Sequence, residues 1–267
     1  MRTARVLVTS LVLVGLSACG SQDPAAVLTA SSSDPGIEQL RVEVVSTSVH
    51  DATAFTQGLE VDDGQLYEGT GLEGRSSVRR TDLATGTVQA RQELAPDVFG
   101  EGVTLAGDRL WQLTWKNGAA IARDPQTLAE TGRAAYDGEG WGLCAQPDRL
   151  VMSNGSATLT FRDRTTFAVL GTVDVTAAGT PLTEINELEC TPDGQVWANV
   201  WKTDQIVRID PGAGHVTAVV DATGLLTPEQ AGSADVLNGI AALPGTDEFL
   251  VTGKLWPTVF TVRFVPA

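Results

Sequence analysis

The chain has 267 residues, enough for one large domain with its own core. Acidic residues outnumber basic ones, 33 to 18, and the formal net charge of −15 argues against nucleic acid or anionic lipid as a partner. With only two histidines, the chain has little material for a His-rich zinc site or a Ser-His-Asp triad.

Residues 1–18 predict an export signal rather than folded structure. Arg2 and Arg5 form a positive start, and the apolar run that follows is too short to span a bilayer comfortably. The next residues, Leu16-Ser17-Ala18-Cys19, resemble the lipobox of bacterial lipoproteins, which implies cleavage before Cys19 and lipid attachment there. An ordinary secretion signal is the alternative. We expect an exported lipoprotein, anchored to the cell membrane only through its lipid and facing the extracellular or periplasmic side.

Residues 19–38 are rich in Ser, Ala, Asp, Pro and Gly and contain few large apolar side chains. Such a segment cannot bury enough surface to fold, so we interpret it as a flexible tether. Residues 39–267 then form the folded domain.

The apolar pattern of this domain alternates with a period of two, in short runs broken by Asp-Gly, Pro-Asp and Gly. Leu40 to Val44, Val196 to Ala198 and Ile206 to Ile209 are examples. No stretch keeps a helical period over three turns, and Leu225 to Ala231 is at most one short helix. The pattern predicts an all-β domain.

Five three-residue segments share one pattern: a polar residue, then Gly or Glu, then an apolar residue. Each segment is followed by a turn and a second strand. They recur roughly every 40 to 50 residues, the spacing of propeller blades. The sequence therefore predicts a five-bladed β-propeller, whose ring is closed by the N-terminal strand at residues 40–48 joining the last blade. The five segments are Gln57-Gly58-Leu59, Glu101-Gly102-Val103, Trp141-Gly142-Leu143, Asn186-Glu187-Leu188 and Asn238-Gly239-Ile240.

Two cysteines, Cys144 and Cys190, lie at near-equivalent points of neighbouring repeats. In an oxidising compartment a disulfide between them is permitted. Two separate buried thiols are the alternative, and the sequence leaves the choice open.

In a propeller, the starts of the inner strands and the ends of the second strands share one face. The residues expected at this mouth are rich in Trp and amides, which favours a pocket that binds a small polar group between aromatic walls. Trp111 and Trp197 lie within strands and are expected in the core instead. Glu68 ends a second strand and has no basic residue within four positions along the chain. It could therefore belong to a site at the channel or lie at an ordinary surface position.

Several motifs resemble those of the glutamine cyclotransferases of the plant and bacterial type, in order over nearly the whole domain. The resemblance implies a five-bladed propeller that converts N-terminal glutamine of peptides or proteins to pyroglutamate and releases ammonia. This family is unrelated to the animal-type zinc enzymes that have the same activity. The motifs are Phe55-Thr56-Gln57-Gly58-Leu59, Glu68-Gly69-Thr70-Gly71-Leu72 with Gly74-Arg75-Ser76-Ser77, Asn186-Glu187-Leu188-Glu189, Trp197-Ala198-Asn199-Val200-Trp201, Leu237-Asn238-Gly239-Ile240-Ala241 and Thr252-Gly253-Lys254-Leu255-Trp256-Pro257.

In the reaction that the resemblance implies, the α-amine attacks the γ-carboxamide of its own residue. Glu68 is expected to shuttle the proton, while Lys254 and Asn154 stabilise the charge on the amide oxygen. Glu101 and Glu187 are candidates to hold the amine. No metal or organic cofactor is expected for these steps. The residues expected to bind the substrate or wall the pocket are Gln57, Trp115, Trp141, Asn186, Glu187, Trp201, Asn238 and Trp256.

Two other functions remain open from the sequence. A non-catalytic propeller would bind a peptide or a sugar at the same mouth. A calcium-dependent hydrolase would need several carboxylates around the axis, and the inner positions offer only Glu101 and Glu187. We expect a monomer by default, because no interface signal is present.

Overall fold

The computed structural model describes residues 36–267. The predicted signal peptide, the lipidation site Cys19 and most of the predicted tether lie outside these residues. Within them the fold is all-β, as predicted, with one short helix, α1 (Pro228–Ala231), inside the stretch expected to hold at most one. No helix of the described part is long and apolar enough to cross a membrane.

The first three sheets in chain order are antiparallel and four-stranded, and in each the strands pair in sequence order. They are β2 (Thr56–Asp62), β3 (Gln65–Thr70), β4 (Ser77–Asp82) and β5 (Val88–Glu93); β6 (Gly100–Leu105), β7 (Leu110–Thr114), β8 (Ala119–Arg123) and β9 (Glu130–Ala135); and β10 (Leu143–Ala145), β11 (Leu150–Met152), β12 (Thr158–Arg162) and β13 (Val169–Asp174).

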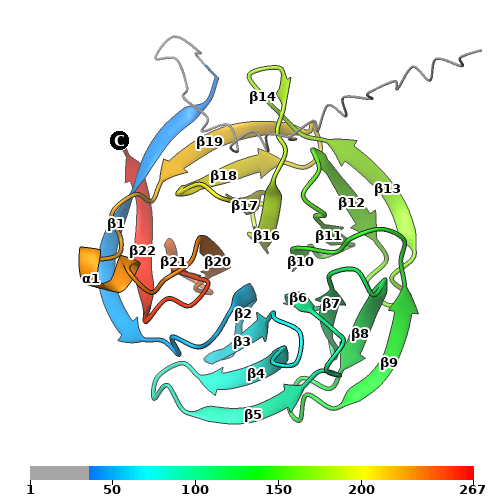
Figure 1. Ribbon diagram of the computed structural model, residues 1–267. Coiled ribbons are helices and arrows are strands. Elements are labelled where there is room, and N and C mark those ends of the chain that lie inside the picture. Colours follow the sequence, from blue (N-terminus) through cyan, green and yellow to red (C-terminus); the bar gives the residue numbers. More distant parts are fainter. Residues whose placement is uncertain (1–35) are drawn as a thin grey trace, which may run out of the picture.

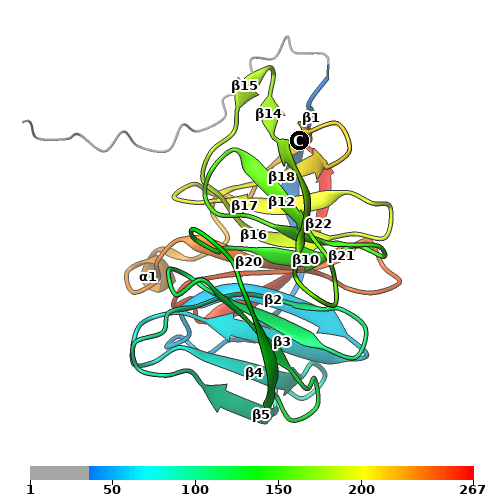
Figure 2. The same ribbon diagram turned by 90° about the vertical axis from the view of Figure 1, so that its right-hand side faces the viewer.

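The remaining strands form one larger sheet with the order β16-β17-β18-β19-β1-β22-β21-β20. In it, β1 pairs antiparallel with β22 and parallel with β19, so the first strand of the described chain lies beside the last. The small hairpin β14–β15 attaches to β19 and stands out from the molecule (Figure 2). The bounds are β1 (Glu38–Val49), β14 (Thr176–Ala177), β15 (Thr180–Pro181), β16 (Ile185–Cys190), β17 (Val196–Val200), β18 (Gln205–Asp210), β19 (His215–Asp221), β20 (Leu237–Ala242), β21 (Glu248–Gly253) and β22 (Thr258–Pro266).

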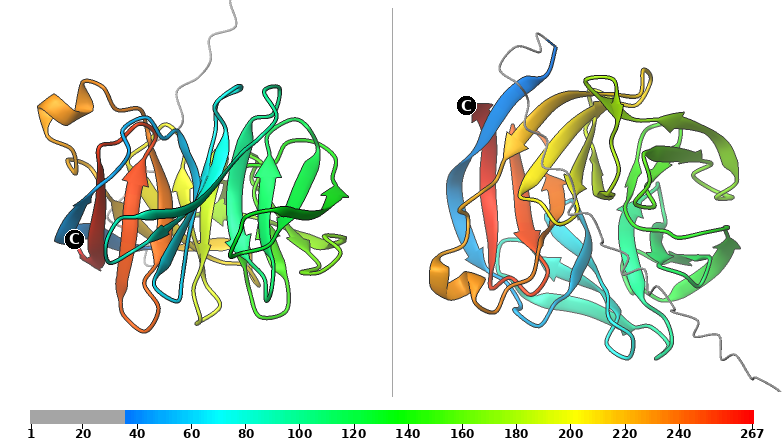
Figure 3. Two further views of the ribbon diagram at one scale, coloured as in Figure 1. Left: turned by 90° about the horizontal axis from the view of Figure 1, so that it is seen from below. Right: turned by 45° about the horizontal axis from the view of Figure 1, so that its top comes forward.

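The sheets are arranged around a central axis in a propeller-like manner (Figure 1). Strands β2, β6, β10, β16 and β20 lie innermost and contact one another. Seen edge-on, the connecting loops gather on two opposite faces (Figure 3). The ends of second strands and the starts of inner strands are thereby brought together.

The hydrophobic core lies between neighbouring sheets. One cluster joins Trp111 and Leu113 of the second sheet to Leu143 and Met152 of the third. Trp197 is buried in another cluster, so both tryptophans expected in the core are there. Because each core layer needs a sheet on both sides, the sheets stabilise one another around the axis.

Short polar turns set the register of the strands. Asp63-Gly64 joins β2 to β3 with positive φ at both residues, the conformation of a tight hairpin turn. Asp124 accepts hydrogen bonds from the backbone and hydroxyl of Thr127 at 2.7 and 2.8 Å in the β8–β9 turn. Such short turns connect successive strands directly and keep them paired.

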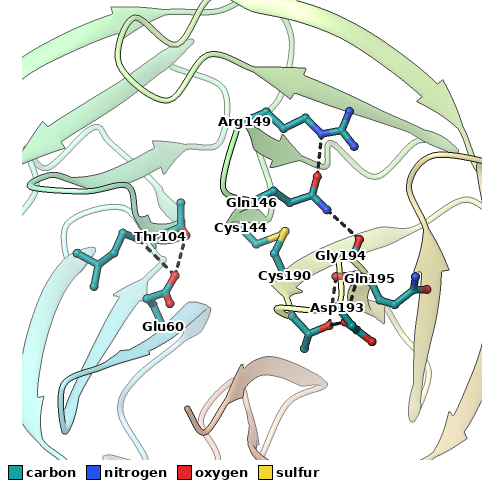
Figure 4. The surroundings of a disulfide bond; sticks show 11 residues. Glu60, Thr104, Cys144, Gln146, Arg149, Cys190, Asp193, Gly194 and Gln195 are labelled. Atoms are coloured by element: carbon teal, nitrogen blue, oxygen red, sulfur yellow. Dashed lines mark hydrogen bonds between the residues drawn. A yellow bond between two sulfur atoms is a disulfide. The ribbon is translucent and has the colours of Figure 1, made fainter. Parts of the chain in front are cut away.

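Cys144 of β10 and Cys190 of β16 form a disulfide, with their Cα atoms 5.3 Å apart (Figure 4). The bond joins two neighbouring sheets and decides the question that the sequence left open. Gln146 donates to the carbonyl of Gly194 at 2.9 Å nearby and adds a second link between these sheets. In the chain-entropy model, closing a loop of this length stabilises the fold by about 4 kcal/mol.

Candidate active site

A cavity of about 210 Å³ opens where inner strands begin and second strands end. Gln57, Glu101 and Asn186 are each the second residue of an inner strand. Trp115, Trp201 and Lys254 directly follow second strands. The convergence expected from the sequence is therefore present. The lining consists of Phe55, Gln57, Phe99, Glu101, Trp115, Trp141, Asn186, Trp201, Asp235 and Lys254.

Aromatic rings form the walls of this cavity. Phe55 and Phe99 meet edge-to-face with centroids 6.1 Å apart, and Phe99 lies 5.5 Å from Trp115. On another side Trp141 and Trp201 meet edge-to-face at 5.3 Å. These are favourable aromatic geometries, so the walls hold each other and lower the polarity inside.

Glu139, in the loop between β9 and β10, holds two of the walls from outside. Its Oε2 accepts hydrogen bonds from the indole Nε1 of Trp115 at 2.7 Å and of Trp141 at 3.0 Å. Lys116 Nζ lies 3.5 Å from the other carboxylate oxygen and 3.8 Å from the centre of the Trp115 ring. Behind Trp141, Gly155 leaves no room for a side chain, because a Cβ there would lie 2.5 Å from the indole.

The polar floor is a chain of hydrogen bonds that ends at Glu101. Asn238 Nδ2 donates to Gln57 Oε1 at 3.2 Å, and Gln57 Nε2 donates to Glu101 Oε1 at 3.2 Å. Glu101 is only 4% exposed. Burial raises the pKa of Glu101 well above its ordinary value of 4.5, although Lys254 acts in the opposite direction. Glu101 is thus a buried carboxyl of raised pKa, suited to exchanging a proton with a substrate.

Lys254 and Asn186 offer complementary polar groups. The Lys254 ammonium is buried and lies 4.9 Å from the centre of the Phe55 ring. Burial lowers the pKa of Lys254, while Glu101 and Asp235 raise it. Asn186 Oδ1 is buried with no hydrogen-bond partner among the described residues. A buried oxygen without a partner is costly, so a ligand that donates a hydrogen bond there would bind favourably.

The arrangement suits acid–base chemistry on a small amide or amine. It combines a buried carboxyl, a cation and an amide oxygen within aromatic walls. Among residues 36–267, no group of three His, Cys, Asp or Glu side chains is placed to hold a metal ion.

Seven residues expected at the mouth line the cavity, namely Gln57, Glu101, Trp115, Trp141, Asn186, Trp201 and Lys254. Phe55, Phe99 and Asp235 are not among the residues expected in the site, and Glu101 is expected there only as a candidate to hold the amine. Phe55 begins one of the family motifs, and this position is a signal that could have identified it.

Glu68 lies outside the cavity, in a buried ion-pair cluster. Its carboxylate accepts hydrogen bonds from Thr56 Oγ1 at 2.7 Å, Arg79 Nε at 2.7 Å and His50 Nε2 at 3.1 Å. Burial alone would raise the pKa of Glu68, but the opposing effects of His50 and Arg79 hold it at about 2. Arg79 also pairs with Asp51 at 2.7 Å. We therefore do not assign the proton shuttle to Glu68, because its carboxylate is already fully engaged.

Glu187 and Asn238 also lie away from the cavity, although both are buried. Glu187 accepts hydrogen bonds from the backbone N–H groups of Leu59 at 3.1 Å and Ile240 at 2.9 Å. It thereby links β16 to β2 and β20 and is not free to bind a ligand. Asn238 acts one step removed from the cavity, by orienting Gln57.

Asn154 and Trp256 complete the set that the structure places elsewhere. Asn154 is exposed, and its Oδ1 accepts hydrogen bonds from the backbone and hydroxyl of Ser156 at 3.1 and 2.6 Å. Trp256 is buried in the core, and its Nε1 donates to the carbonyl of Asp235 at 2.8 Å. Trp256 therefore supports the loop that carries Asp235 rather than walling the cavity.

Comparison with known proteins agrees with this geometry. Residues 14–264 match the family model for glutamine cyclotransferase. The glutaminyl-peptide cyclotransferase of Arabidopsis thaliana is 38% identical over 232 residues, which cover 85% of this chain and 72% of that protein. The crystal structure of Myxococcus xanthus glutaminyl cyclase is 36% identical and superposes with a TM-score of 0.80, covering 86% of this chain and 99% of the other.

A more distant structure supports the fold alone. The β-propeller domain of Cps50 (Swd1) from Myceliophteria thermophila is 10% identical, with a TM-score of 0.51 over 83% of this chain and 99% of that domain. Together with the two closer relatives, it agrees with the propeller-like arrangement of the sheets. The match over nearly the whole domain shows that the chain belongs to the glutamine cyclotransferase family.

Proposed function

We propose that this protein converts the N-terminal glutamine of peptides or proteins to pyroglutamate with release of ammonia, and that Glu101 moves the proton. The observation that carries this proposal is the position of Glu101, a buried carboxyl of raised pKa inside an aromatic cavity. At about 210 Å³ the cavity is below the usual range for drug-sized ligands, which suits a single side chain and its amine. The plant and bacterial relatives carry the names of this activity.

Ring closure needs the glutamine side chain folded back on its own amine. The α-nitrogen then attacks the γ-carboxamide carbon, the C–N bond of the lactam forms, and the bond to the amide nitrogen breaks. Because both reacting groups belong to one residue, a pocket that fixes the folded rotamer supplies much of the rate. The aromatic walls can supply that confinement and exclude water.

Proton transfer requires one group that accepts a proton and then returns it. The attacking nitrogen must lose a proton, and the leaving nitrogen must gain one to depart as ammonia. Glu101 can do both in turn if it starts as the carboxylate. Gln57 fixes one Glu101 oxygen by its hydrogen bond, which keeps the carboxyl in place for both transfers.

Lys254 and Asn186 would complete the pocket. Negative charge develops on the amide oxygen during attack, and the buried Lys254 ammonium is placed to stabilise it. Asn186 Oδ1 would accept a hydrogen bond from the substrate amine or amide. The proposed steps use no cofactor, and a monomeric enzyme remains our proposal.

The test compares Glu101→Gln with Glu68→Gln in the full-length protein, using a short peptide with N-terminal glutamine. We expect the parent to release ammonia and the peptide to lose the mass of one ammonia. Glu101→Gln should lower kcat about 100- to 10,000-fold, the usual contribution of general acid–base catalysis. Glu68→Gln should keep most activity wherever circular dichroism shows a folded protein. If Glu68→Gln is folded but inactive while Glu101→Gln remains active, the assignment to Glu101 is wrong.

The pH dependence gives an independent readout of the same group. Glu101 must be ionised to accept the first proton, so activity should fall as the pH drops through its pKa. Because that pKa is raised, the acidic limb of the kcat profile should lie above the ordinary 4.5. The limb should disappear from the residual activity of Glu101→Gln. An acidic limb at or below the ordinary value would contradict the proposal.

We further propose that the sheets form five blades and that β1 closes the ring as the outermost strand of the last one. The pairing supports this proposal, because β1 is antiparallel to β22 but parallel to β19. The antiparallel set β20-β21-β22-β1 then matches the four-strand pattern of the first three sheets. Deleting residues 36–49, most of which belong to β1, should strongly lower the unfolding temperature if this strand closes the ring.

An exported lipoprotein anchored through Cys19 also remains our proposal. The leader and lipobox-like residues support it, and so does the disulfide, because such bonds persist in oxidising compartments. Cell fractionation tests it: Cys19→Ser should move the protein from the membrane fraction to the soluble exported fraction. Equal distribution of both proteins would contradict lipid anchoring.

A further inference from the structure

A second cavity of about 490 Å³ adjoins the candidate active site. Phe55 lines both cavities. Gly71 lines the second one, and a Cβ at this position would lie 2.3 Å from the Phe99 ring and 3.2 Å from Gln57 Cγ, so Gly71 packs against two residues that line the first. The second cavity therefore lies directly beside the pocket proposed for the glutamine. We name it the Arg75 cleft; its lining comprises residues 51, 53–55, 70, 71, 74, 75, 77, 79, 91, 93, 94 and 96.

Three arginines and two carboxylates line the Arg75 cleft, so the charges of the lining residues do not cancel. Arg79 pairs with Asp51 at 2.7 Å and also with Glu68, and Arg91 pairs with Glu93 at 2.7 Å. Both carboxylates that line the cleft are thus engaged by other arginines.

Arg75 itself has no carboxylate within ion-pair distance among residues 36–267. Its side chain is exposed, and the hydrogen bond it makes is a long one, 3.4 Å from Nη2 to the carbonyl of Thr53. One guanidinium with open donors therefore faces the cleft, in a protein whose net charge is −15.

The backbone around Arg75 is fixed, so the side chain is presented from a defined place. Arg75 N donates to the carbonyl of Leu72 at 3.0 Å, and Ser76 Oγ donates to the same carbonyl at 2.9 Å. Leu72 and Gly74 both have positive φ, which folds this connection between β3 and β4 tightly. Gly74 and Arg75 belong to a motif that the resemblance identified but to which it gave no role.

We propose that the Arg75 cleft is a subsite for the residues that follow the N-terminal glutamine, and that Arg75 binds a carboxylate there. This inference rests on the proposed function. When the glutamine of a substrate fills the first cavity, the residues that follow it must extend out of that cavity past the aromatic walls. An extended chain advances about 3.3 Å per residue. A guanidinium with free donors binds a carboxylate through two parallel hydrogen bonds. The carboxylate comes from an acidic side chain or from the C-terminus of a short peptide.

The experiment measures kcat/KM of the full-length protein on four peptides. A neutral reference is Gln-Ala-Ala with an amidated C-terminus, and two amidated peptides carry Glu at the second or third position. The fourth is Gln-Ala-Ala with a free C-terminus, so that the two sources of the carboxylate are separated. We expect the parent to favour at least one acidic peptide about 2- to 5-fold over the neutral one, as for an exposed ion pair. The preference should shrink as salt is added.

Arg75→Ala should bring this ratio close to one, and Arg75→Lys should keep part of it. Arg41→Ala is the matched control, because Arg41 is an exposed arginine of β1 that lines neither cavity, and it should leave the ratio unchanged. Equal kcat/KM for all four peptides in the parent, or a preference that survives in Arg75→Ala, would overturn the subsite while leaving the cyclase activity established. A parent that turns over no peptide would instead overturn the proposed function, and this subsite with it.

Discussion

At the scale of single residues, Glu139 has a role that its sequence position does not reveal. Its Oε2 accepts hydrogen bonds from both Trp115 and Trp141, which belong to the walls of the cavity. The carboxylate itself does not line the cavity. Removing it should loosen the walls without touching the groups that transfer protons. We expect Glu139→Ala to raise KM about three- to tenfold with little change in kcat, consistent with two partly exposed hydrogen bonds to a charged acceptor.

Glu139→Gln tests whether the carboxyl group positions the indoles. The amide keeps one acceptor oxygen, so it should restore part of the KM. Tryptophan fluorescence should change more in Glu139→Ala than in Glu139→Gln, because the environment of two indoles changes. Equal loss of kcat in both variants, with unchanged fluorescence, would show that Glu139 acts in some other way.

Glu68 and Glu101 differ in a way that the sequence does not reveal. Both Glu68 and Glu101 lie at positions expected near the mouth, and the resemblance favoured Glu68. What separates them is contact with residues distant in sequence: Glu68 is engaged by His50 and Arg79, whereas Glu101 receives one hydrogen bond, from Gln57. The repeat pattern places most of the lining tryptophans and amides and the lysine correctly, although Trp256, Asn154 and Asn238 lie elsewhere. The partners of each carboxylate could not be placed from it.

At the scale of elements, the inner strands are so close that most of them need glycine at the same repeat position. A Cβ on Gly58 would lie 2.6 Å from Val103 N, and one on Gly102 would lie 2.7 Å from the carbonyl of Trp141. The fourth repeat carries Glu187 there instead. Its side chain extends to the N–H groups of Leu59 and Ile240, so it joins three inner strands at the axis.

Replacing Glu187 should therefore destabilise the whole ring. Glu187→Ala leaves two buried backbone donors without acceptors, each worth about 1–3 kcal/mol, so we expect a loss of about 2–6 kcal/mol in the free energy of unfolding. Glu187→Gln keeps one acceptor and should lose less. Urea unfolding measures both, with the exposed Glu73→Ala as a control near zero. If Glu187→Ala unfolds at the parental urea concentration, the axial link contributes nothing.

The strands themselves were predictable because their signal is local. Period-two alternation and Asp- or Gly-containing turns are properties of a few neighbouring residues, and the structure bears them out in hairpins such as β2–β3 and β8–β9. The short helix α1 falls within the predicted stretch for the same reason. The hairpin β14–β15 was not anticipated, since its two-residue strands are too short to show a period.

At the scale of the whole molecule, the recurrence of the five segments led to the propeller-like arrangement, because a repeat that cannot bury its own faces must stack on its neighbours. The disulfide could be suggested but not decided, as it depends on the distance between β10 and β16. The charge distribution was not accessible either. The net charge of −15 does not reveal that the inner strands carry the buried Glu187 and Glu189 and the half-buried Glu60.

These buried carboxyls should make stability depend on pH. Burial raises the pKa of Glu60 from 4.5 to about 7, despite hydrogen bonds from Thr104 Oγ1 at 2.6 Å and from the Leu105 N–H. Burial also raises the pKa values of Glu187 and Glu189. A raised carboxyl pKa means that the folded state holds its proton more tightly than the unfolded chain. Stability from these groups is therefore complete below 4.5 and is lost as the pH rises through the folded values.

The buried ion pairs of Glu68 also make stability depend on pH. With its pKa held at about 2, Glu68 contributes stability above its ordinary 4.5, and this contribution is lost as the pH falls through about 2. For His50, burial lowers the pKa, but the interactions with Glu68 and the backbone of Trp256 together raise it above the ordinary 6.5. Stability from His50 is thus present below 6.5 and is lost as the pH rises through its folded value. Together these groups place the maximum of stability in mildly acidic solution.

We expect the free energy of unfolding to fall by a few kcal/mol between pH 4.5 and about 7, with Glu60 alone accounting for roughly 3 kcal/mol of it. Glu60→Gln keeps an acceptor for Thr104 but cannot ionise, so its stability should decline less steeply over that range. Urea unfolding at a series of pH values gives both slopes, and Glu73→Gln controls for the loss of an exposed charge. If the stability of Glu60→Gln declines as steeply as that of the parent, folding does not raise the pKa of Glu60 and other groups cause the decline.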